Sequence, residues 1–417
     1  MKKIGIQFYY GWIIVFIGAL SIFFSGPGQT YSVSIFIDFY IEEFGWSRSQ
    51  ISSFYSIATL ISGFFMPVVG NLIDKKGQRK ATITVALLFG LTLIWMSMIQ
   101  APWMILIGFL FIRMFGQGSL TLIPNVLIPQ WFVSKRGRAL SFISYGGVMG
   151  AAFIPPLNNY LIQNYSLSIA WLFWAAMMFF ILLPIAFFFM KNRPEDIGLL
   201  PDGAEKLSEL NKSKAKPASE AVSWTLQEAK QTRSFWLMLF VSAVPSLLNT
   251  AITFHIVSII GEKGYGATFA AFLLSTIAIT QMVLTVFAGY TVERVPVHIV
   301  KGFNYILYAG VIFLLIFANN DIYLIGFAIL QGFFMAFDTV STGVLWPNYF
   351  GRMHLGKIRG LTMAAMVIGS ALGPFPYGVA YDYLGSYNQI LLVSIALPVF
   401  ASIASFLSPA PVHKSME

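Results

Sequence analysis

Three side chains that could carry chemistry lie inside long hydrophobic segments of this sequence: Arg113, His255 and Asp338. Burying a charged side chain at the centre of a bilayer costs about 3 kcal/mol even on the mildest scale, so such residues are functional candidates. His255 is also a candidate, because its imidazole can gain or lose a proton near neutral pH. These three residues could hold a charged solute or move a proton.

Each of the three also has a purely structural interpretation. Arg113 could be a cation in a substrate cavity or a coupling residue, or it could be bonded to the backbone and polar groups of neighbouring helices. Asp338 could take up a proton, or it could belong to a salt bridge or an inner gate. His255 could titrate, although a lone histidine is more often a satisfied polar contact. The sequence leaves these alternatives open.

Uncharged polar side chains within the apolar segments form a second set of candidates: Asn249, Gln281 and Gln331. Each could line a cavity, or could form hydrogen bonds between helices, which is the more ordinary role. In the first apolar segment Pro27 stands between two glycines, a pattern that predicts a kinked or broken helix. Membrane carriers use broken helices near their binding sites.

A compact basic loop lies at 70–80, with the sequence GNLIDKKGQRK. Basic residues squeezed between two apolar segments predict a tight cytoplasmic turn between membrane helices. Gly70 and Gly77 allow a close helix approach and a sharp turn, and Asp74 is expected to be paired among the bases. We predict that Asp74, Arg79 and Lys80 form a latch that stabilises an outward-open conformation.

The elements that must position these residues are membrane helices. The chain of 417 residues is 57% hydrophobic and only 10% charged, whereas soluble proteins carry about 25% charged residues. Its composition therefore predicts an all-α membrane protein. The apolar segments predict twelve transmembrane helices, six on each side of one linker, and the repeated pattern described below indicates two pseudo-symmetric six-helix bundles. The segments long and apolar enough to cross a bilayer are 11–35, 50–73, 81–99, 102–128, 139–163, 168–190, 235–259, 267–292, 298–317, 321–347, 358–381 and 388–408.

Positive charge predicts the orientation of these helices. Of the 26 Lys and Arg residues, 23 fall in segments assigned to the inside, and Lys301 is one of these 23. The exceptions are Arg48, Arg113 and Lys263. Because basic residues concentrate in cytoplasmic loops, both termini are expected in the cytoplasm, with the chain in the inner or plasma membrane.

One long polar segment separates the two predicted bundles and divides the chain into 1–190, a cytoplasmic linker at 191–233, and 234–417. The middle of the linker is rich in Lys, Glu, Ser and Ala, a composition typical of a flexible connector. Its end could form a short surface helix with Trp224 and Leu226 at the membrane interface, or it could simply be solvated.

A short pattern, a glycine followed four residues later by an acid, is repeated along the chain. It occurs at 70–74 and recurs at 289–293, which adds Glu293 to the latch residues. It returns at 378–382, at the opposite expected side of the membrane. Such echoes are typical of carriers built from duplicated and inverted repeats.

The two six-helix halves, the linker and the 70–80 loop together resemble the major facilitator superfamily over nearly the whole chain. The loop fits that superfamily's pattern of Gly, three residues, Asp, a basic residue, any residue, Gly and further basic residues. An Arg followed by Gly-x-Gly in the fourth helix is matched by Arg113, Gly116 and Gly118. The resemblance implies two bundles that rock about a central site and expose it alternately to each side.

Shorter motifs resemble the branch that contains the monocarboxylate and oxalate/formate-type carriers. They lie at 10–12, 43–47, 193–196, 201–203 and 224–226. Oxalate/formate-type carriers place an arginine in the eighth helix, four residues before the glycine that corresponds to Gly289. That position is Thr285 here, and the eighth predicted span contains no Lys or Arg.

The resemblance implies secondary active transport of a small organic solute, with protons as the expected coupling ion, and no enzyme activity. On resemblance, symport of a monocarboxylate-like anion ranks first. Export of amphiphilic or drug-like compounds ranks second, favoured by the missing arginine. A third alternative is a transporter-like receptor that senses a solute and signals without net flux.

The remaining partners follow from what the sequence lacks. It contains no cysteine, which excludes disulfides, thiolate metal sites and cysteine nucleophiles. It has no phosphate-binding glycine loop, metal-ligand cluster or nucleophile constellation. We expect no cofactor, no metal and no nucleic acid, but a small-molecule substrate, the lipid bilayer and a monomeric chain.

Overall fold

The fold is known from a computed structural model that describes residues 9–132, 135–202, 224–351 and 355–411. The regular elements in this part of the chain are helices, with one isolated bridge between Phe132 and Asp202. Within the described residues, eleven spans are long and apolar enough to cross a membrane, and several of them join two successive helices. The second predicted span is helix α3, which has 29 residues and is not one of those eleven. The prediction of an all-α membrane protein is confirmed.

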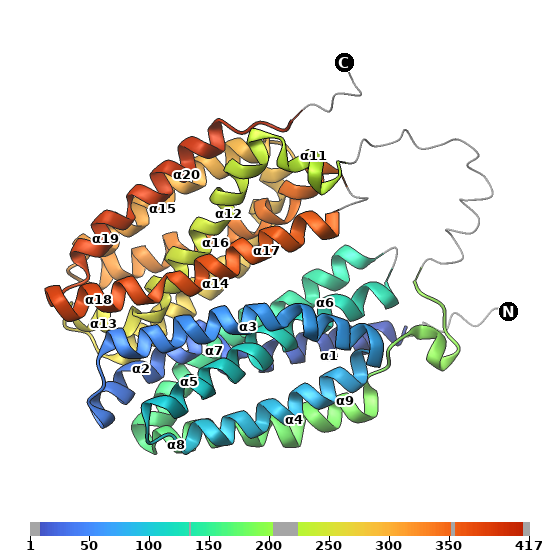
Figure 1. The fold of residues 1–417 in the computed structure, drawn as a ribbon, viewed down its shortest axis with the longest axis horizontal. Helices are drawn as coiled ribbons and strands as arrows, with labels where there is room; N and C mark the ends of the chain where they lie inside the picture. The colour runs from blue at the N-terminus through green and yellow to red at the C-terminus, as the bar shows by residue number, and fades with distance from the viewer. Residues whose placement is uncertain (1–8, 133–134, 203–223, 352–354, 412–417) are drawn as a thin grey trace. The chain divides into compact units, whose positions relative to one another are not determined.

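The first half of the chain follows the predicted order of spans, and its first helix is broken where Pro27 predicts it. A single tight turn at Gly26–Gly28 separates α1 from α2, while α5 continues through an irregular, widened stretch at Ile112–Ser119 into α6 (Figure 1). The helices are α1 (Gly11–Phe24), α2 (Thr30–Phe44), α3 (Arg48–Lys76), α4 (Gln78–Ser97), α5 (Pro102–Phe111), α6 (Leu120–Trp131), α7 (Arg136–Asn164), α8 (Leu167–Met177) and α9 (Leu183–Phe189).

The second half begins with a short helix and repeats the pattern of long spans. Three of these spans are interrupted, at His255, at Gly373 and at Ile395 (Figure 1). The helices are α11 (Leu226–Lys230), α12 (Arg233–Phe254), α13 (Ile256–Gly261), α14 (Ala267–Val292), α15 (Val297–Phe317), α16 (Asp321–Phe350), α17 (Leu355–Leu372), α18 (Pro374–Leu384), α19 (Asn388–Ser394) and α20 (Ala396–Phe406).

The chain divides into two compact units whose boundaries differ from the linker. One unit comprises Met1–Gln29, Phe64–Gly150 and Leu161–Pro217, and the other comprises Thr30–Gly63, Ala151–Tyr160 and Ala218–Glu417. The second unit therefore includes all of α2 and parts of α3 and α7 from the first half of the sequence. The division of the sequence at 190 and 234 stays a prediction.

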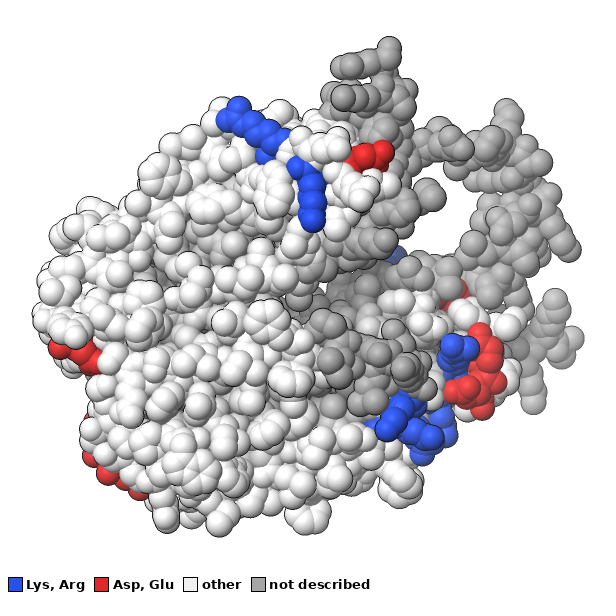
Figure 2. Space-filling model, viewed as in Figure 1, with Lys and Arg blue, Asp and Glu red and all other residues white. Residues whose placement is uncertain are grey.

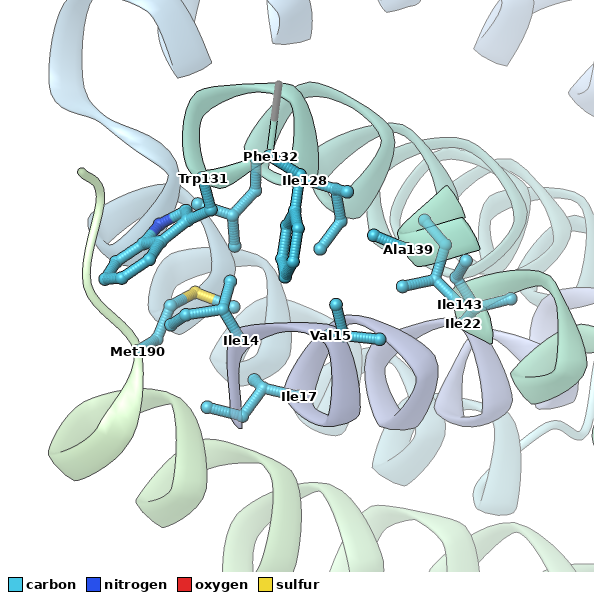
Figure 3. Packing of buried hydrophobic residues seen from close by; sticks show 11 residues of the cluster. Ile14, Val15, Ile17, Ile22, Ile128, Trp131, Phe132, Ala139, Ile143 and Met190 are labelled. Carbon is cyan, nitrogen blue, oxygen red and sulfur yellow. The ribbon is translucent and has the colours of Figure 1, made fainter. Parts of the chain in front are cut away.

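In the first unit the core forms where α1, α6 and α7 meet the end of α9. Figure 3 shows its aliphatic side chains packed around the rings of Trp131 and Phe132, with Met190 closing one side. These rings and Met190 are completely buried. Large aromatic residues contribute most to such a core because each removes the greatest apolar area from its surroundings.

The second unit packs its long helices in pairs. Helix α15 lies against both α16 and α20, α14 lies against α16, and α12 lies against α17 (Figure 1). From the first half of the sequence, α2 contacts α12, α13 and α14 in the same unit. Most of the face in Figure 2 is uncharged, as is expected for helices that meet lipid.

Both described ends of the linker are fixed by backbone hydrogen bonds to the ends of long helices. The amide of Asp202 donates to the carbonyl of Trp131 at 3.1 Å, and the amide of Trp224 donates to the carbonyl of Phe350 at 3.0 Å. The predicted short helix is present as α11, begun by a reciprocal cap of Thr225 and Glu228. Trp224 is buried against the Phe350 ring and is not an interfacial anchor.

Candidate functional site

Asp338 belongs to a buried ion pair that the sequence prediction missed. The Lys301 ammonium lies 2.7 Å from the Asp338 carboxylate and donates a second bond of 2.7 Å to the hydroxyl of Thr342. Lys301 is completely buried, while the Asp338 side chain is 16% exposed. The salt-bridge alternative for Asp338 thus describes its position in this conformation.

Lys301, which the charge count places with the inside segments, belongs to a helix. It lies in the second turn of α15, where its aliphatic stem is packed and its ammonium faces α16. Tyr305 lies one turn further along α15 and donates its hydroxyl to the Val241 carbonyl, with Asp338 at 3.4 Å. A charge count cannot separate a loop lysine from one in the first turns of a helix, although the apolar residues around Lys301 were a signal.

His255 lies at the junction of α12 and α13 and is almost fully buried. Its Nε2 lies 2.9 Å from the Pro374 carbonyl and its Nδ1 lies 3.0 Å from the Tyr387 hydroxyl. Its ring also stacks on that of Tyr377. Both ring nitrogens therefore have partners, which is the satisfied polar contact that the sequence left as the alternative to titration.

The uncharged polar candidates form hydrogen bonds between helices. Gln331 on α16 donates to Asn249 on α12 at 3.0 Å, and Gln281 on α14 donates to Thr339 on α16 at 3.4 Å. The structure thus brings Asn249 and Gln331 together and places Gln281 against the residue that follows Asp338. Four of the six cavity candidates consequently lie on or against α16. Their part in binding a substrate stays a prediction.

Arg113 lies in the irregular stretch that joins α5 to α6, and only 3% of it is exposed. Its Nη1 is directed at the carbonyl of Gly28 in the helix break, at 3.5 Å. Widened helical turns of this kind occur frequently at functional sites. The sequence located the break and the arginine separately, and the structure shows that they face each other.

Gly28 permits this close approach. A β-carbon at Gly28 would lie 2.2 Å from the Ile112 carbonyl oxygen and 3.0 Å from the α-carbon of Gly116. Both contacts are with backbone, which cannot move aside as a flexible side chain would. The backbone of the break and that of the widened stretch are therefore in direct contact.

The 70–80 loop turns as predicted at Gly77, whose φ of +80° is a conformation that other residues rarely adopt. The backbone amide of Arg79 donates to the Asn192 side chain at 2.8 Å, and its guanidinium donates to the Phe187 carbonyl at 2.5 Å. Lys80 and Glu293 are exposed, Gly70 lies within α3, and the Asp74 side chain lies outside the part described. The latch stays a prediction.

The opposite end of α3 carries contacts that the sequence analysis did not foresee. Arg48, the first residue of α3, pairs with Asp38 of α2 at 2.5 Å and lies 4.9 Å above the Tyr381 ring of α18. The amide of Ser49 donates to the Asp382 carboxylate at 2.9 Å. A carboxylate at this position also interacts favourably with the positive end of the helix dipole. We call Asp38, Arg48, Ser49, Tyr381 and Asp382 the Arg48 cluster.

This cluster gives the repeated glycine–acid pattern at 378–382 a structural role. A β-carbon at Gly378 would lie 2.6 Å from the Ser52 hydroxyl and 3.1 Å from the Arg48 carbonyl. The glycine lets α18 lie directly against α3, and the acid four residues later caps the start of α3. A segment of the first half is thereby bonded to a helix of the second half within one compact unit.

The whole sequence was compared with protein families and known proteins. It matches the family model described as Major Facilitator Superfamily over residues 12–301 and 239–416. It is 32% identical over 152 residues to the multidrug resistance protein MdtG of Yersinia enterocolitica, and 27% identical over 194 residues to that of Dickeya zeae. These matches cover 34% and 44% of this chain, but only 36% and 45% of the relatives' own lengths.

Solved structures show the same fold at low sequence identity. A bacterial homolog of the human lysosomal transporter Spinster, in an inward-facing and occupied conformation, matches with a TM-score of 0.71 and 12% identity, covering 97% of both chains. A mutant of the nucleoside transporter NupG matches with a TM-score of 0.72 and 14% identity, covering 96% of this chain and 99% of the other.

Proposed function

Because this chain belongs to the major facilitator superfamily, we propose that it is a secondary active exporter of amphiphilic, drug-like compounds that works by alternating access. The chain is a multi-pass membrane transporter and not an enzyme. The substrate class and the direction of transport are supported by the relatives named multidrug resistance protein. The main support for an uncharged substrate is that the buried cations Lys301 and Arg113 already have partners.

A carrier of monocarboxylates needs a cation with which to hold the carboxylate. Among the described residues, the two buried basic side chains already have partners, Lys301 with Asp338 and Arg113 with the backbone at Gly28. Thr285 replaces the arginine of the oxalate/formate-type pattern. These observations favour an uncharged or amphiphilic cargo over the anion that the sequence motifs alone would rank first.

The Arg48 cluster supports the proposed alternating access. Its bonds join α2 and α3 of the first half to α18 of the second half, so they must break before a cavity can open at this end. The glycine–acid pattern at 378–382 is repeated at 70–74, at the opposite end of α3. By analogy, the pattern at 70–74 would close that end when the Arg48 end is open. Charge distribution predicts that the Arg48 end faces outward, so these bonds would help to close the outer end.

Proton coupling would use the ion pair between α15 and α16. A proton that neutralises Asp338 would leave the Lys301 ammonium without its counter-ion in an apolar setting, which is unfavourable. The helices would then favour a conformation in which Lys301 gains another partner or water. Asp338 is therefore the proposed coupling residue, and the alternation of its charge would bias the two conformations.

Flux through purified protein in proteoliposomes tests this function. Radiolabelled chloramphenicol serves as a neutral amphiphile and radiolabelled lactate as a monocarboxylate, each measured with and without a pH gradient. We expect gradient-dependent movement of chloramphenicol that a protonophore abolishes, and lactate movement no faster than in empty liposomes. Faster lactate flux would support the monocarboxylate alternative. Ligand-induced thermal stabilisation without any flux would instead support the receptor alternative.

A further inference from the structure

A second site is indicated by a pocket of about 730 Å³ in the second unit. Its walls come from the first half of α3, from Leu247 of α12, from the break between α17 and α18, and from α19 and α20. This volume lies within the range of small-molecule sites in proteins, roughly 300–1,000 Å³. Several of its walls face outward, since Leu372 is 56% exposed and Val393 is 69% exposed. The pocket therefore opens toward the surface at which these spans meet lipid.

The lining of the pocket is uncharged. Among the described residues that form it there is no Lys, Arg, His, Asp or Glu, and most are Ile, Leu, Val, Phe, Pro or Ala. The Tyr377 hydroxyl donates to Ser394 at 2.8 Å, and the Ser53 hydroxyl donates to the carbonyl of Gln50 in its own helix. A carboxylate or an ammonium would find no counter-ion here, so the pocket suits an uncharged ligand.

Ser56 is the exception among the serines of α3. Ser52, Ser53 and Ser62 each donate back to a carbonyl three or four residues earlier, which is the usual way to satisfy a hydroxyl in a helix. Ser56 is one of the residues that line the pocket, and its buried oxygen has no hydrogen-bond partner among the described residues. The side chain would turn about its Cα–Cβ bond to present the hydroxyl to a ligand. A buried hydroxyl without a partner is unfavourable, and a ligand in the pocket would supply one.

Lipid around the protein decides what kind of molecule gains from binding here. Lipid tails are as apolar as the lining, so an alkyl chain moving from the bilayer into the pocket gains little from the hydrophobic effect. A polar atom that is unpaired in the bilayer, however, would gain a hydrogen bond from Ser56. Selectivity therefore rests on the shape of the pocket and on that one hydroxyl.

We propose that this pocket binds an uncharged, mainly apolar molecule from the bilayer, which accepts a hydrogen bond from Ser56. Ser56 lies eight residues beyond Arg48, about 12 Å along the helix axis. Half of the hydrocarbon core is about 15 Å thick, so the hydroxyl lies deep within one leaflet. The ester groups of phospholipids lie near the membrane surface, which makes lipid itself a poor partner for Ser56. The assignment of this ligand as transported cargo rests on the proposed function.

Photolabelling of the full-length protein in phosphatidylcholine vesicles tests the pocket without any need for transport. Three diazirine probes of equal chain length are compared: a ketone with its carbonyl in mid-chain, the matching alkane, and the matching fatty acid as its carboxylate. We expect saturable labelling of pocket residues by the ketone only. Equal labelling by the alkane would overturn the proposal, because the pocket would then be filled by any lipid chain. Preferential labelling by the carboxylate would also overturn it.

Two neighbouring serines provide the matched variants. Ser56→Ala is expected to weaken saturable labelling by the ketone roughly threefold to tenfold, whereas Ser53→Ala should change it less than about twofold, because that hydroxyl is bonded to its own helix. Ala396→Trp, which fills the pocket from its exposed wall, should remove saturable labelling altogether. Identical behaviour of the two serine variants would contradict the proposal.

The outcomes for the pocket and for the transporter are separable. Labelling of the pocket together with an absence of flux would leave the binding site intact and overturn the proposed export. Flux of chloramphenicol without ketone labelling would support the proposed export and overturn the binding site. Melting temperatures of the variants equal to that of the unmodified protein ensure that altered labelling reflects the pocket and not loss of folding.

Discussion

Arg113 and Lys301 are both buried cations in membrane helices, but the protein accommodates them differently. Arg113 points at a backbone carbonyl where one helix is broken and another is widened. Lys301 is held by a carboxylate, a hydroxyl and the packing of two uninterrupted helices. Backbone dipoles cannot be removed by a proton, whereas the charge of a carboxylate can. The difference supports the proposal that Arg113 is structural and that the pair of Lys301 and Asp338 couples transport to protons.

The largest expected effect comes from breaking the ion pair. Asp338→Asn leaves the Lys301 ammonium buried beside a neutral amide, which should destabilise the protein by about 3–5 kcal/mol. Thermal unfolding in detergent measures the loss. The matched control replaces both residues, Lys301→Met with Asp338→Asn, and should recover most of the stability. A double variant as unstable as the single one would show that the charge pair is not the cause.

A smaller loss is expected at the helix break that faces Arg113. Gly28→Ala would place a methyl group against the backbone of Ile112, and overpacking of this kind costs about 1–3 kcal/mol. Gly289→Ala is the control, because a β-carbon there meets open space and should stabilise α14 by up to about 1 kcal/mol. Equal melting temperatures for the two variants would contradict the close contact at Gly28.

The Arg48 cluster should contribute less to stability than to the choice of conformation. Asp38→Asn removes the partner of a partly exposed arginine and should cost about 1 kcal/mol or less. It should nevertheless raise the reactivity of the buried cysteine made by Ser52→Cys toward a membrane-impermeant maleimide, because the closed end opens more often. Unchanged reactivity relative to the same cysteine with Asp38 intact would remove the cluster from the gate.

The smallest effect is expected for the hydrogen bond between α12 and α16. A double-mutant cycle of Asn249→Ala and Gln331→Ala should give a coupling energy of about 0.6 kcal/mol, as is usual for such bonds in membranes. Thermal unfolding of the four proteins measures it. Normal stability with loss of chloramphenicol flux in the single variants would instead place these amides in the substrate cavity.

The sequence was sufficient to predict the helical class, the series of spans and the broken first helix. These features depend on local composition, on apolar length and on Pro27. Asp338 was recognised as unusual, but its partner Lys301 is 37 positions away, and their meeting depends on how α15 and α16 are rotated. The contact between Ser49 and Asp382 could not be predicted either, because contacts between distant helices leave no local pattern in the sequence.

Other features were hidden because their sequence has two physical interpretations. Trp224 near a predicted membrane surface is typical of an interfacial anchor, yet its ring is buried against Phe350. Ser56 looks like any serine in an apolar helix, and only the missing hydrogen-bond partner of its oxygen distinguishes it from Ser53. Such distinctions are decided by tertiary packing, and sequence reasoning cannot supply them.

The most direct test of alternating access is the distance across the Arg48 cluster. The chain contains no cysteine, so spin labels can be placed at exposed positions by Glu43→Cys on α2 and Tyr383→Cys on α18. Tyr323→Cys combined with Tyr383→Cys gives a control distance within the second half. We predict that chloramphenicol with a pH gradient produces a second, longer distance for the first pair and none for the control. One unchanged distance for the first pair, while flux continues, would contradict the account.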